Sequence, residues 1–564
     1  MSLFTDASLV MIPSGIKDQK IYSVTPTDGS GDLTFTRSND TASRVASNGL
    51  IEKVLTNLYT YSQSFANAAW LAVDVTKVST SATDPNGGTT AANITWTSGS
   101  GRYFYQNEGM SSTATVSIWV KSNGGGNSFR LFANGGTSFS SNLTATSTWT
   151  RYSFAFAGTG SVGIGISNAS DNSAADLLVA FAQLETGDIA TDYIATTTAA
   201  VSVGPVANLP RLDYSGGASC PRLLLEPQRT NSQTYSEDLT QATAWGLGDT
   251  TISANATTSP DGYQNADKLV ETATTARHEL YGKSLAFSGT SSVSFFAKAA
   301  ERRYLSAFVA GDPSVGGATF DLQTGTITET SGGTTAKIED YTNGWYRCSF
   351  TTTSTATTTL YLCLRTNGGA PTIETYAGDG TSGLYIWGAQ TELAGAYASS
   401  YIPTLGAAVT RGADAASKTS ATALIGQTEG TAFIEFNIDN LSESGGEKVL
   451  FYMKDTGVGE RYLSLVNNGN LTYVEYNGAI IANITKSSMA IGNHKAAIAY
   501  ANNDFVLYVD GVLAGSDTSG TPNGYSTFGL QYYSASVIGK QSVSQALLFK
   551  TRLSNADLAT LTTI

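Results

Sequence analysis

The sequence predicts an all-β protein built from tandem antiparallel β-sandwiches. Three observations lead to this prediction: few charged residues, apolar residues that alternate with polar ones, and an internal repeat. Charged residues make up 14% of the 564, against about 25% in typical soluble domains. Glu and Lys are therefore too scarce for long solvent-exposed helices. The 58 glycines follow no three-residue period, which excludes a collagen-like chain.

An internal repeat divides the first three quarters of the chain. Six short blocks of the first copy return in the same order in the second copy, with growing insertions between them. The paired blocks are 60–62 and 234–236, Trp70 and Trp245, 116–121 and 293–298, 149–154 and 345–350, 182–185 and 389–392, and 193–196 and 401–404. Ordered recurrence of this kind indicates two copies of one domain. The largest insertion, between Lys298 and Trp345, contains a predicted hairpin around Thr324-Gly325.

Local patterns predict strands in both copies and in a third, different unit. In 116–121, apolar residues alternate with polar ones or Trp119, which is typical of a strand with one buried face. In the third unit, Asp510-Gly511 stands between two valines and predicts a two-residue hairpin turn. The stretch 553–561 is the exception to the β pattern. It is predicted to be a helix with Ser554 or Asn555 as its N-cap.

These patterns predict five segments. They are a short β-rich N-terminal docking or stem segment at 1–56, the first repeated domain at 57–203, a connector at 204–230, the second repeated domain at 231–415, and the third unit at 421–564. The segments 1–56 and 204–230 are too short for a core of their own. We expect them to pack together or against neighbouring subunits.

Charge and composition exclude several classes of function. The net charge of −13 and the lack of Lys/Arg clusters argue against nucleic acid as a partner. We expect no membrane insertion, because no apolar run approaches 18 residues, and no secretory signal peptide, because the first residues lack the required pattern. With two histidines, His278 and His494, most histidine-based catalysis and zinc chemistry is excluded. His278 is predicted to lie in a surface loop and His494 to be structural.

The three cysteines do not form a disulfide scaffold. Cys348 and Cys363 lie at equal distances from a Ser/Thr-rich turn, so we expect them to face each other across an antiparallel strand pair. Two small core residues are the simpler interpretation of this pair, and a disulfide is the alternative.

Two long runs and several short ones resemble fibre and virion proteins of tailed bacteriophages. The long runs are 209–217 and 220–231, and Phe35-Thr-Arg37 followed by 49–52 belongs with them. The repeats resemble carbohydrate-binding-module-like jelly rolls, through the Tyr-Ser start, the block 344–347, and the stretch from Gly388 to Thr404. The third unit resembles concanavalin-A-like or laminin-G-like sandwiches, through 507–511 and the closing stretch 548–554.

The resemblance implies a structural virion protein, a head or tail fibre or decoration protein that is assembled in the host cytoplasm. Its expected partners are other virion proteins and bacterial surface polysaccharide, and a homotrimer is expected by analogy. Two alternatives stay open. One is a purely structural decoration protein without glycan binding, and the other is a polysaccharide-degrading tailspike.

Sugar binding requires exposed aromatic faces together with polar groups for the hydroxyls. Residues present in both copies, such as Trp70 and Trp245, are predicted to be packing residues, and the shared Gln and Glu of 183–185 and 390–392 to satisfy backbone groups. Aromatic residues without a counterpart in the other copy are the better candidates. The predicted carbohydrate-binding residues are Tyr103, Tyr105, Tyr281, Tyr304, Tyr376, Trp387, Tyr525, Tyr532 and Tyr533.

We expect no catalysis, cofactor or metal. A glycosidase needs two carboxylates about 5–10 Å apart, and no pair stands in a recognisable motif. Glu339 and Asp340 are adjacent, so on a strand they would point to opposite faces. No nucleophile elbow, phosphate-binding loop or calcium-loop spacing is present.

Overall fold

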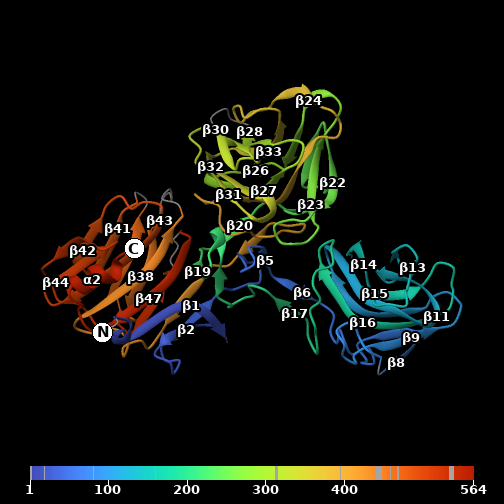
Figure 1. Ribbon diagram of the computed structural model, residues 1–564, viewed down its shortest axis with the longest axis horizontal. Helices are drawn as coiled ribbons and strands as arrows, with labels where there is room; N and C mark the ends of the chain where they lie inside the picture. Colours follow the sequence, from blue (N-terminus) through green and yellow to red (C-terminus); the bar gives the residue numbers. More distant parts are fainter. Residues whose placement is uncertain are drawn as a thin grey trace. The chain divides into compact units, whose positions relative to one another are not determined.

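The structure is a computed structural model, and it consists almost entirely of antiparallel strands. It describes residues 3–564 with the exception of 18, 81, 159, 311–315, 394, 440–446, 458, 467–468 and 532–538. The chain forms two compact units, of which one is 54–204 and the other combines the residues up to 53 with those from 205 onward (Figure 1). The prediction of an all-β fold of tandem sandwiches is confirmed. None of the described helices is long and apolar enough to cross a membrane.

The unit 54–204 is the first jelly roll. Its long strand β11 belongs to both layers, because its first half pairs with β14 and β16 while its second half pairs with β15, β12 and β13. The core between the layers includes Trp70, Phe104, Val116 and Ile166. The strands are β6 (Leu55–Asn57), β7 (Leu71–Val73), β8 (Thr76–Ser79), β9 (Ala92–Trp96), β10 (Tyr103–Met110), β11 (Thr113–Ala133), β12 (Ser138–Phe139), β13 (Leu143–Thr144), β14 (Thr150–Ala157), β15 (Gly160–Asn168), β16 (Ala175–Thr186) and β17 (Val201–Val203).

The second jelly roll has two separate layers. One layer has the order β21-β25-β33-β28-β29-β30, and the other has the order β22-β23-β35-β27-β32-β31. The strands are β20 (Arg229–Asn231), β21 (Trp245–Gly248), β22 (Thr250–Thr257), β23 (Ala266–Glu271), β24 (Thr275–Arg277), β25 (Glu279–Gly282), β26 (Leu285–Ala286), β27 (Gly289–Ala299), β28 (Tyr304–Ala310), β29 (Gly317–Asp321), β30 (Thr326–Ser331), β31 (Ala336–Asp340), β32 (Tyr346–Ser354), β33 (Thr357–Arg365), β34 (Thr375–Ala377), β35 (Gly383–Glu392) and β36 (Val409–Arg411).

Strand register confirms the repeat. In the first copy, Ser117 pairs with Gln183 and Trp119 with Ala180, across a register shift. In the second copy, Ser294 pairs with Gln390 and Phe296 with Trp387, across the same shift. The insertion of the second copy supplies β29, β30 and β31, and the predicted hairpin at Thr324-Gly325 joins the first two of these strands.

The C-terminal sandwich is one strongly curved sheet. Its strand order is β42-β41-β40-β39-β46-β37-β3-β2-β1-β47-β38-β43-β44-β45, and the two halves enclose one apolar core. The elements are α1 (Leu3–Asp6), β1 (Leu9–Lys17), β2 (Lys20–Thr25), β3 (Leu33–Thr36), β37 (Ala415–Lys418), β38 (Gly430–Ile438), β39 (Glu447–Lys454), β40 (Glu460–Val466), β41 (Leu471–Tyr476), β42 (Ile480–Lys486), β43 (Gly492–Ala501), β44 (Asp504–Val509), β45 (Val512–Asp517), β46 (Thr527–Leu530), β47 (Gln541–Phe549) and α2 (Asn555–Thr562).

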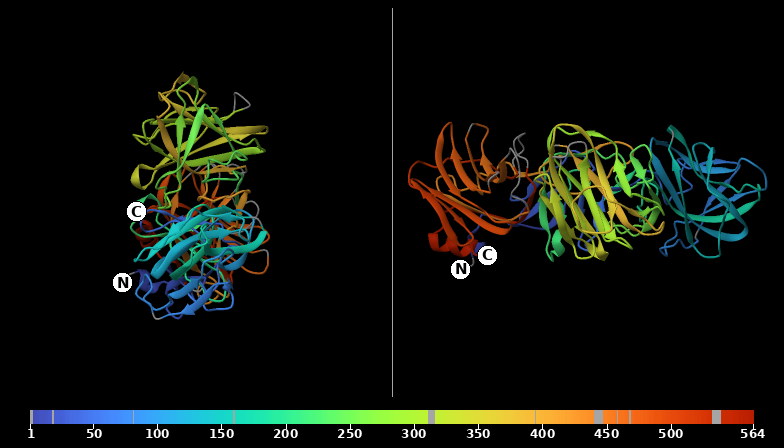
Figure 2. Two further views of the ribbon diagram at one scale, coloured as in Figure 1. Left: turned by 90° about the vertical axis from the view of Figure 1, so that its right-hand side faces the viewer. Right: turned by 90° about the horizontal axis from the view of Figure 1, so that it is seen from above.

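Two local predictions for this sandwich are confirmed. Val509 pairs with Val512 across Asp510-Gly511, and both turn residues have positive φ. Helix α2 begins after Ser554, whose side chain accepts a hydrogen bond from the Asp557 amide. This helix packs with residues of α1 and β1 on the outer face of the sheet, where it appears in red in Figure 2.

The N-terminal residues do not form a separate segment, contrary to expectation. Strand β1 pairs with β47 and β3 pairs with β37, so β1–β3 join the two halves of the C-terminal sheet (Figure 1). The connector is also part of this fold, because β19 (Arg222–Leu225) pairs with β18 (Arg211–Asp213) on one side and β47 on the other. The hairpin of β4 (Ser43–Val45) and β5 (Ile51–Lys53) hydrogen-bonds to the second jelly roll through Ser43 and Ile51. The N-terminal residues and the connector are too short for a core of their own because they complete the cores of the C-terminal sandwich and the second jelly roll.

Cys348 and Cys363 do not face each other across a hairpin, which corrects that prediction. Cys348 lies on β32 and Cys363 on β33, and these strands belong to opposite layers of the second jelly roll. Both thiols are free and buried. The Ser/Thr-rich turn is therefore an arch between two sheets, and a symmetric spacing about it cannot distinguish an arch from a hairpin.

A buried ion cluster joins the N-terminal strands, the connector and the second jelly roll. Arg211 contacts Glu226 at 2.8 Å and also pairs with Asp414, while Arg411 lies 3.0 Å from Glu226. Arg37 donates to Asp414 at 3.2 Å. All five side chains are fully buried. Burial raises the pKa of Glu226, but the charges of Arg411 and Arg211 outweigh burial and hold this pKa well below its ordinary value.

We predict that Glu226→Gln lowers the free energy of unfolding by about 3–5 kcal/mol, because it leaves buried guanidinium groups without their counter-charge. Urea unfolding at pH 7 measures this change. The matched control is Glu301→Gln, which removes an ion pair with Lys268 in which the glutamate is about half exposed, and we expect less than about 1 kcal/mol there. Equal effects of the two substitutions would contradict the role of the cluster.

The lowered pKa of Glu226 also predicts an acid dependence of stability. Below about pH 4.3, the ordinary pKa of glutamate, the unfolded chain takes up a proton that the folded cluster resists. The contribution of Glu226 is therefore complete at pH 7, begins to fall near the ordinary pKa, and is lost progressively as the pH falls toward the much lower pKa of the folded state. The difference between the urea midpoints of the wild type and Glu226→Gln should begin to shrink near pH 5 and continue to shrink at lower pH; a constant difference would refute this.

Candidate functional site

Polar residues shared by the two jelly rolls form the same closing network in each copy. Asn57 donates to the carbonyls of Ala182 and Ile194, and Asn231 donates to those of Ala389 and Ile402. The side-chain oxygens of Gln183 and Gln390 accept from Ile194 and Ile402, both at 2.7 Å. Glu185 and Glu392 accept from the backbone of Thr191 and Ser399. The shared Gln and Glu therefore satisfy backbone groups, as predicted.

The outer face of one layer of the first jelly roll carries a row of aromatic and apolar side chains. Cross-strand register places Leu71, Tyr105, Gly165, Phe132 and Phe139 side by side on four neighbouring strands and β12. Their sequence neighbours, such as Phe104 and Leu131, point the other way into the core. This row is called the first aromatic row below.

Tyr103 and Tyr105 lie together on this face. The rings of Tyr103 and Tyr105 have centroids 4.9 and 5.9 Å from that of Phe132. Tyr105 lies over Gly163, where an added Cβ would be 2.8 Å from its ring. Both tyrosines are half-buried. Because Gly163 has no side chain, the Tyr105 ring lies directly on the sheet, and part of the ring remains accessible to solvent.

The second jelly roll has an aromatic row at the same register position. Gly246, Tyr281, Tyr361, Phe308 and Gly317 are neighbours across the sheet. Tyr361 stacks on Phe308 with a centroid distance of 5.4 Å and an angle of 6°. An added Cβ at Gly246 would lie 2.2 Å from the Tyr281 ring. We call this the second aromatic row.

The register shows that Tyr105 and Tyr281 are counterparts, as are Phe132 and Phe308. Each tyrosine pairs with the residue that follows the shared tryptophan, Leu71 in one copy and Gly246 in the other. The view that Tyr105 and Tyr281 are specific to their copies is therefore corrected. Tyr105 and Tyr281 are shared by the two copies but lie outside the core. The need for a packed core therefore does not explain why both copies have a tyrosine at this position.

Tyr304 and Tyr376 occupy different surroundings. Tyr304 is four residues before Phe308 on β28, so it lies on the same outer face, where Arg303 stacks on its ring at 4.8 Å. Tyr376 lies on β34, away from the row. Its hydroxyl donates to Glu271 at 2.8 Å, and its ring packs against His278 at 4.6 Å. His278 is buried, with Nδ1 2.7 Å from the carbonyl of Asp249, which corrects its predicted surface position.

Trp387 and Tyr525 are buried, which corrects their assignment as ligand-stacking residues. Trp387 is fully buried beside Phe296 and Tyr401. Tyr525 is 2% exposed, and its hydroxyl donates to Glu475 at 3.0 Å. Their copy-specific or loop positions in the sequence gave no sign of this, because long-range neighbours cover them. Tyr532 and Tyr533 lie outside the described residues.

The residues predicted from the sequence did not include Phe139 and Tyr361, which are half-buried members of the two rows. A usable signal was present: Gly163 and Gly165 alternate with Ile164 and Ile166, so the middle of one face of that strand has no side chains. Such a bare face accommodates aromatic rings from neighbouring strands. Among the described residues, no group of three or more His, Cys, Asp or Glu side chains is placed to hold a metal ion.

We predict that Trp387→Ala chiefly destabilises the fold, by about 3–5 kcal/mol, because it opens a cavity in a buried cluster. Tyr281→Ala should shift the unfolding midpoint far less, since its ring is half-exposed on the outer face. Thermal and urea unfolding of the two variants check this order. A larger loss for Tyr281→Ala would place that ring among the packing residues.

The chain is similar in structure to single domains of known proteins, each over about a quarter of its length. No protein-family model and no curated protein matches the sequence. Among solved structures, the chain is similar to the CBM40 domain of Ruminococcus gnavus IT-sialidase bound to α2,3-sialyllactose. That alignment has 17% identity and a TM-score of 0.22, and covers 24% of this chain and 84% of that one.

Two binding domains of toxins are also similar. They are that of botulinum neurotoxin serotype D, with 13% identity and a TM-score of 0.23, and that of Paraclostridial Mosquitocidal Protein 1, with 14% identity and a TM-score of 0.22. Each alignment covers 26% of this chain, and it spans 39% of the first domain and 43% of the second.

Proposed function

We propose that this protein binds carbohydrate without cleaving it, through the outer faces of its two jelly rolls. One observation carries the proposal: half-buried tyrosines occupy the same register position on the outer face of both copies, each over a glycine. A ring that lies flat on a sheet offers its other face to a ligand. A pyranose has an apolar face of matching size, and neighbouring polar groups such as Asn107 and Arg130 can meet its hydroxyls.

Two equivalent surfaces on one chain suit a ligand that is itself repetitive. A single stacking contact between sugar and tyrosine is weak, but a polysaccharide can engage both jelly rolls at once. Linked sites raise the overall avidity by about 10²–10⁴ without any new contact. The absence of a catalytic motif in the sequence supports a binding role without catalysis.

In its finer form, the proposal is that the protein is a fibre or decoration protein of a tailed bacteriophage. It would be assembled in the host cytoplasm, pack as a homotrimer with other virion proteins, and attach the particle to bacterial surface polysaccharide. The support is the resemblance of the runs around Arg37, 209–217 and 220–231 to such proteins. These are the runs that supply Arg37, Arg211 and Glu226 to the buried ion cluster, so the resembling residues have a structural role.

The test is binding of the purified chain to an array of bacterial glycans, with a parallel assay for released reducing ends. We expect binding without release. Release of reducing ends would refute the non-enzymatic proposal, and failure of the assembled protein to bind any glycan would favour the purely structural alternative.

We predict that Tyr105→Ala and Tyr281→Ala each weaken binding to a positive glycan, by about ten-fold, the size of one lost aromatic anchor. The double variant should lose more than either single variant, because avidity is removed as well. Tyr22→Ala is the matched control, since this tyrosine is 37% exposed on β2, outside both jelly rolls. Surface plasmon resonance on immobilised glycan measures the four variants, and undiminished binding by the double variant would rule out the aromatic rows.

A further inference from the structure

A second line of side chains lies beside the first aromatic row on the outer face of the first jelly roll. Cross-strand register places Tyr103, Ser167 and Arg130 next to one another on β10, β15 and β11. Each of them is two residues from a member of the first aromatic row on the same strand, so all three side chains are on that outer face. An aromatic ring and a guanidinium therefore flank a serine within one face of the sheet.

Arg130 is held in place by neutral groups. The Cζ of its guanidinium lies 4.1 Å from the centroid of the Phe139 ring, and its Nε donates to the carbonyl of Asn168 at 3.2 Å. The two terminal nitrogens make no hydrogen bond to a described residue. These two nitrogens form the fork that can bind both oxygens of a carboxylate. The ring and the carbonyl thus orient the guanidinium, while its terminal edge stays available for a ligand.

No carboxylate forms an ion pair with Arg130 among the residues that the structure describes. Asp171, in the loop after β15, accepts a hydrogen bond from the Ser173 amide at 3.0 Å, and hydrogen bonds from Ser173 lower its pKa below the ordinary value. The two positions of this unit outside the described residues are Ser81 and Thr159, which carry no charge. Within the first jelly roll, the charge of Arg130 is therefore left for a ligand.

The second jelly roll has a different chemistry at the same positions. There, register places Glu279, Cys363 and Ser306 next to one another, so Glu279 is the counterpart of Tyr103 and Ser306 that of Arg130. Glu279 is 3% exposed, and burial raises the pKa of its carboxyl above the ordinary value. The second aromatic row therefore has a carboxyl group beside it and a serine at the place of the guanidinium.

Two arginines lie near these positions in the second jelly roll, and each has a carboxylate beside it. Arg277 lies 3.8 Å from Glu279, and Arg303 pairs with Asp321. Their charge is compensated within the protein, unlike that of Arg130.

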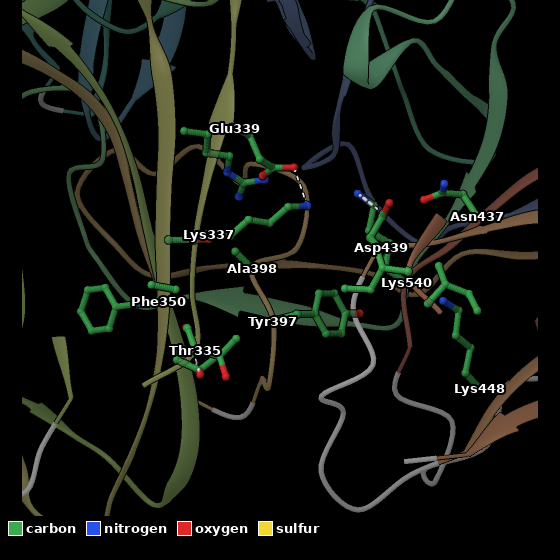
Figure 3. Close-up of a pocket in the computed structure, with 16 residues that line it drawn as sticks. Thr335, Lys337, Glu339, Phe350, Tyr397, Ala398, Asn437, Asp439, Lys448 and Lys540 are labelled. Atoms are coloured by element: carbon green, nitrogen blue, oxygen red, sulfur yellow. Dashed lines mark hydrogen bonds and ion pairs between the residues drawn. The ribbon is translucent and has the colours of Figure 1, made fainter. Parts of the chain in front are cut away.

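The cavity of about 410 Å³ between the second jelly roll and the C-terminal sandwich has walls of mixed charge. Lys337 pairs with Glu339 at 2.8 Å and Lys540 with Asp439 at 3.0 Å (Figure 3). Arg347 lies opposite Glu339 on the neighbouring strand. Burial raises the pKa of Glu339, but the charges of Lys337 and Arg347 lower it below its ordinary value. These three cations have carboxylates beside them, so their charge does not indicate an anionic ligand.

We propose that the outer face of the first jelly roll binds an acidic sugar, whose carboxylate is held by the terminal nitrogens of Arg130 while its ring lies against Tyr103 and Tyr105. This inference rests on the proposed function and adds the ligand class of one of the two surfaces. A carboxylate carries one negative charge, which the single guanidinium balances, whereas a phosphate dianion would keep an excess charge next to the aromatic rings. With Glu279 and Ser306 at these positions, the second jelly roll does not form this site.

The test is calorimetric titration of the full chain with trigalacturonic acid and with its neutral methyl ester. We expect the acid to bind about ten-fold more tightly than the ester at low salt, with the difference shrinking as salt screens the charges. Equal affinity for the acid and the ester, or no binding of either, overturns the proposal. Inorganic phosphate that competes at equal concentration would identify a general anion site and overturn the sugar assignment.

Substitutions of Arg130 locate the site. Arg130→Gln should lower the affinity for the acid to that for the ester, and Arg130→Lys should keep part of the preference, because it retains the charge but loses the fork. Lys121→Gln is the matched control, since it removes one positive charge from the first half of the same strand β11, which pairs with the other layer. A preference for the acid that survives in Arg130→Gln, or that Lys121→Gln abolishes equally, refutes the assignment.

Failure of this inference can be distinguished from failure of the proposed function. Tyr105→Ala should weaken binding of trigalacturonic acid more than Tyr281→Ala does, because only the row of Tyr105 has the guanidinium beside it. Glycans that bind through both rows without preference for the acid would overturn the acidic-sugar site and leave the proposed function intact. If no glycan on the array binds at all, the proposed function itself fails.

Discussion

The larger unit depends on one buried electrostatic arrangement, in which Arg211 contacts both Glu226 and Asp414. Fully buried charges are stable only when each has partners in good geometry. Here the partners come from strands that are far apart in the sequence, and the cluster is completed by Arg37 and Arg411. Burial lowers the pKa of Arg37 to about 10, with Asp414 opposing this shift, so Arg37 stays charged at neutral pH. The cluster therefore holds the N-terminal strands, the connector and the second jelly roll in one compact unit.

The two jelly rolls separate their structural from their surface residues in the same way. The network around Asn57 and Asn231 closes each sandwich with matching hydrogen bonds, and it leaves little freedom for substitution. The aromatic rows lie on the opposite layer, where glycine stripes let tyrosine rings rest on the sheet. Because a core would not require this second feature, its presence in both copies is the strongest structural indication of a common binding surface.

Duplication also allowed the copies to diverge at one edge. In the second jelly roll, the inserted strands β29–β31 extend both layers, and β31 brings Lys337 and Glu339 to the face that borders the C-terminal sandwich. In the first jelly roll, the corresponding edge belongs to β14. A repeated fold can thus keep one type of surface in both copies and place a chemically different cavity in one of them.

Sequence alone determined the features that arise from neighbouring residues. The alternation along β11 and β27, the turns at Thr324-Gly325 and Asp510-Gly511, and the N-cap at Ser554 all follow from local backbone and side-chain preferences. Recurring blocks established the duplication, since two copies of one fold require the same packing residues. These signals sufficed for the all-β class. Tyr105 and Tyr281 were predicted as residues specific to their copies, whereas strand register makes them counterparts.

Only the tertiary structure decided which surfaces are covered. Trp387 and Tyr525 are buried by residues more than a hundred and about fifty positions away, so no local pattern shows that their rings are inaccessible. The arch between Cys348 and Cys363 has the same spacing as a hairpin, and the two differ only in which layer receives the second strand. Likewise, the sequences of β1–β3 show only short apolar stretches. Pairing with β47 and β37, which lie far away in the sequence, makes these strands part of the C-terminal sheet. Strand pairing over long distances determines burial, and burial determines which residues can meet a ligand.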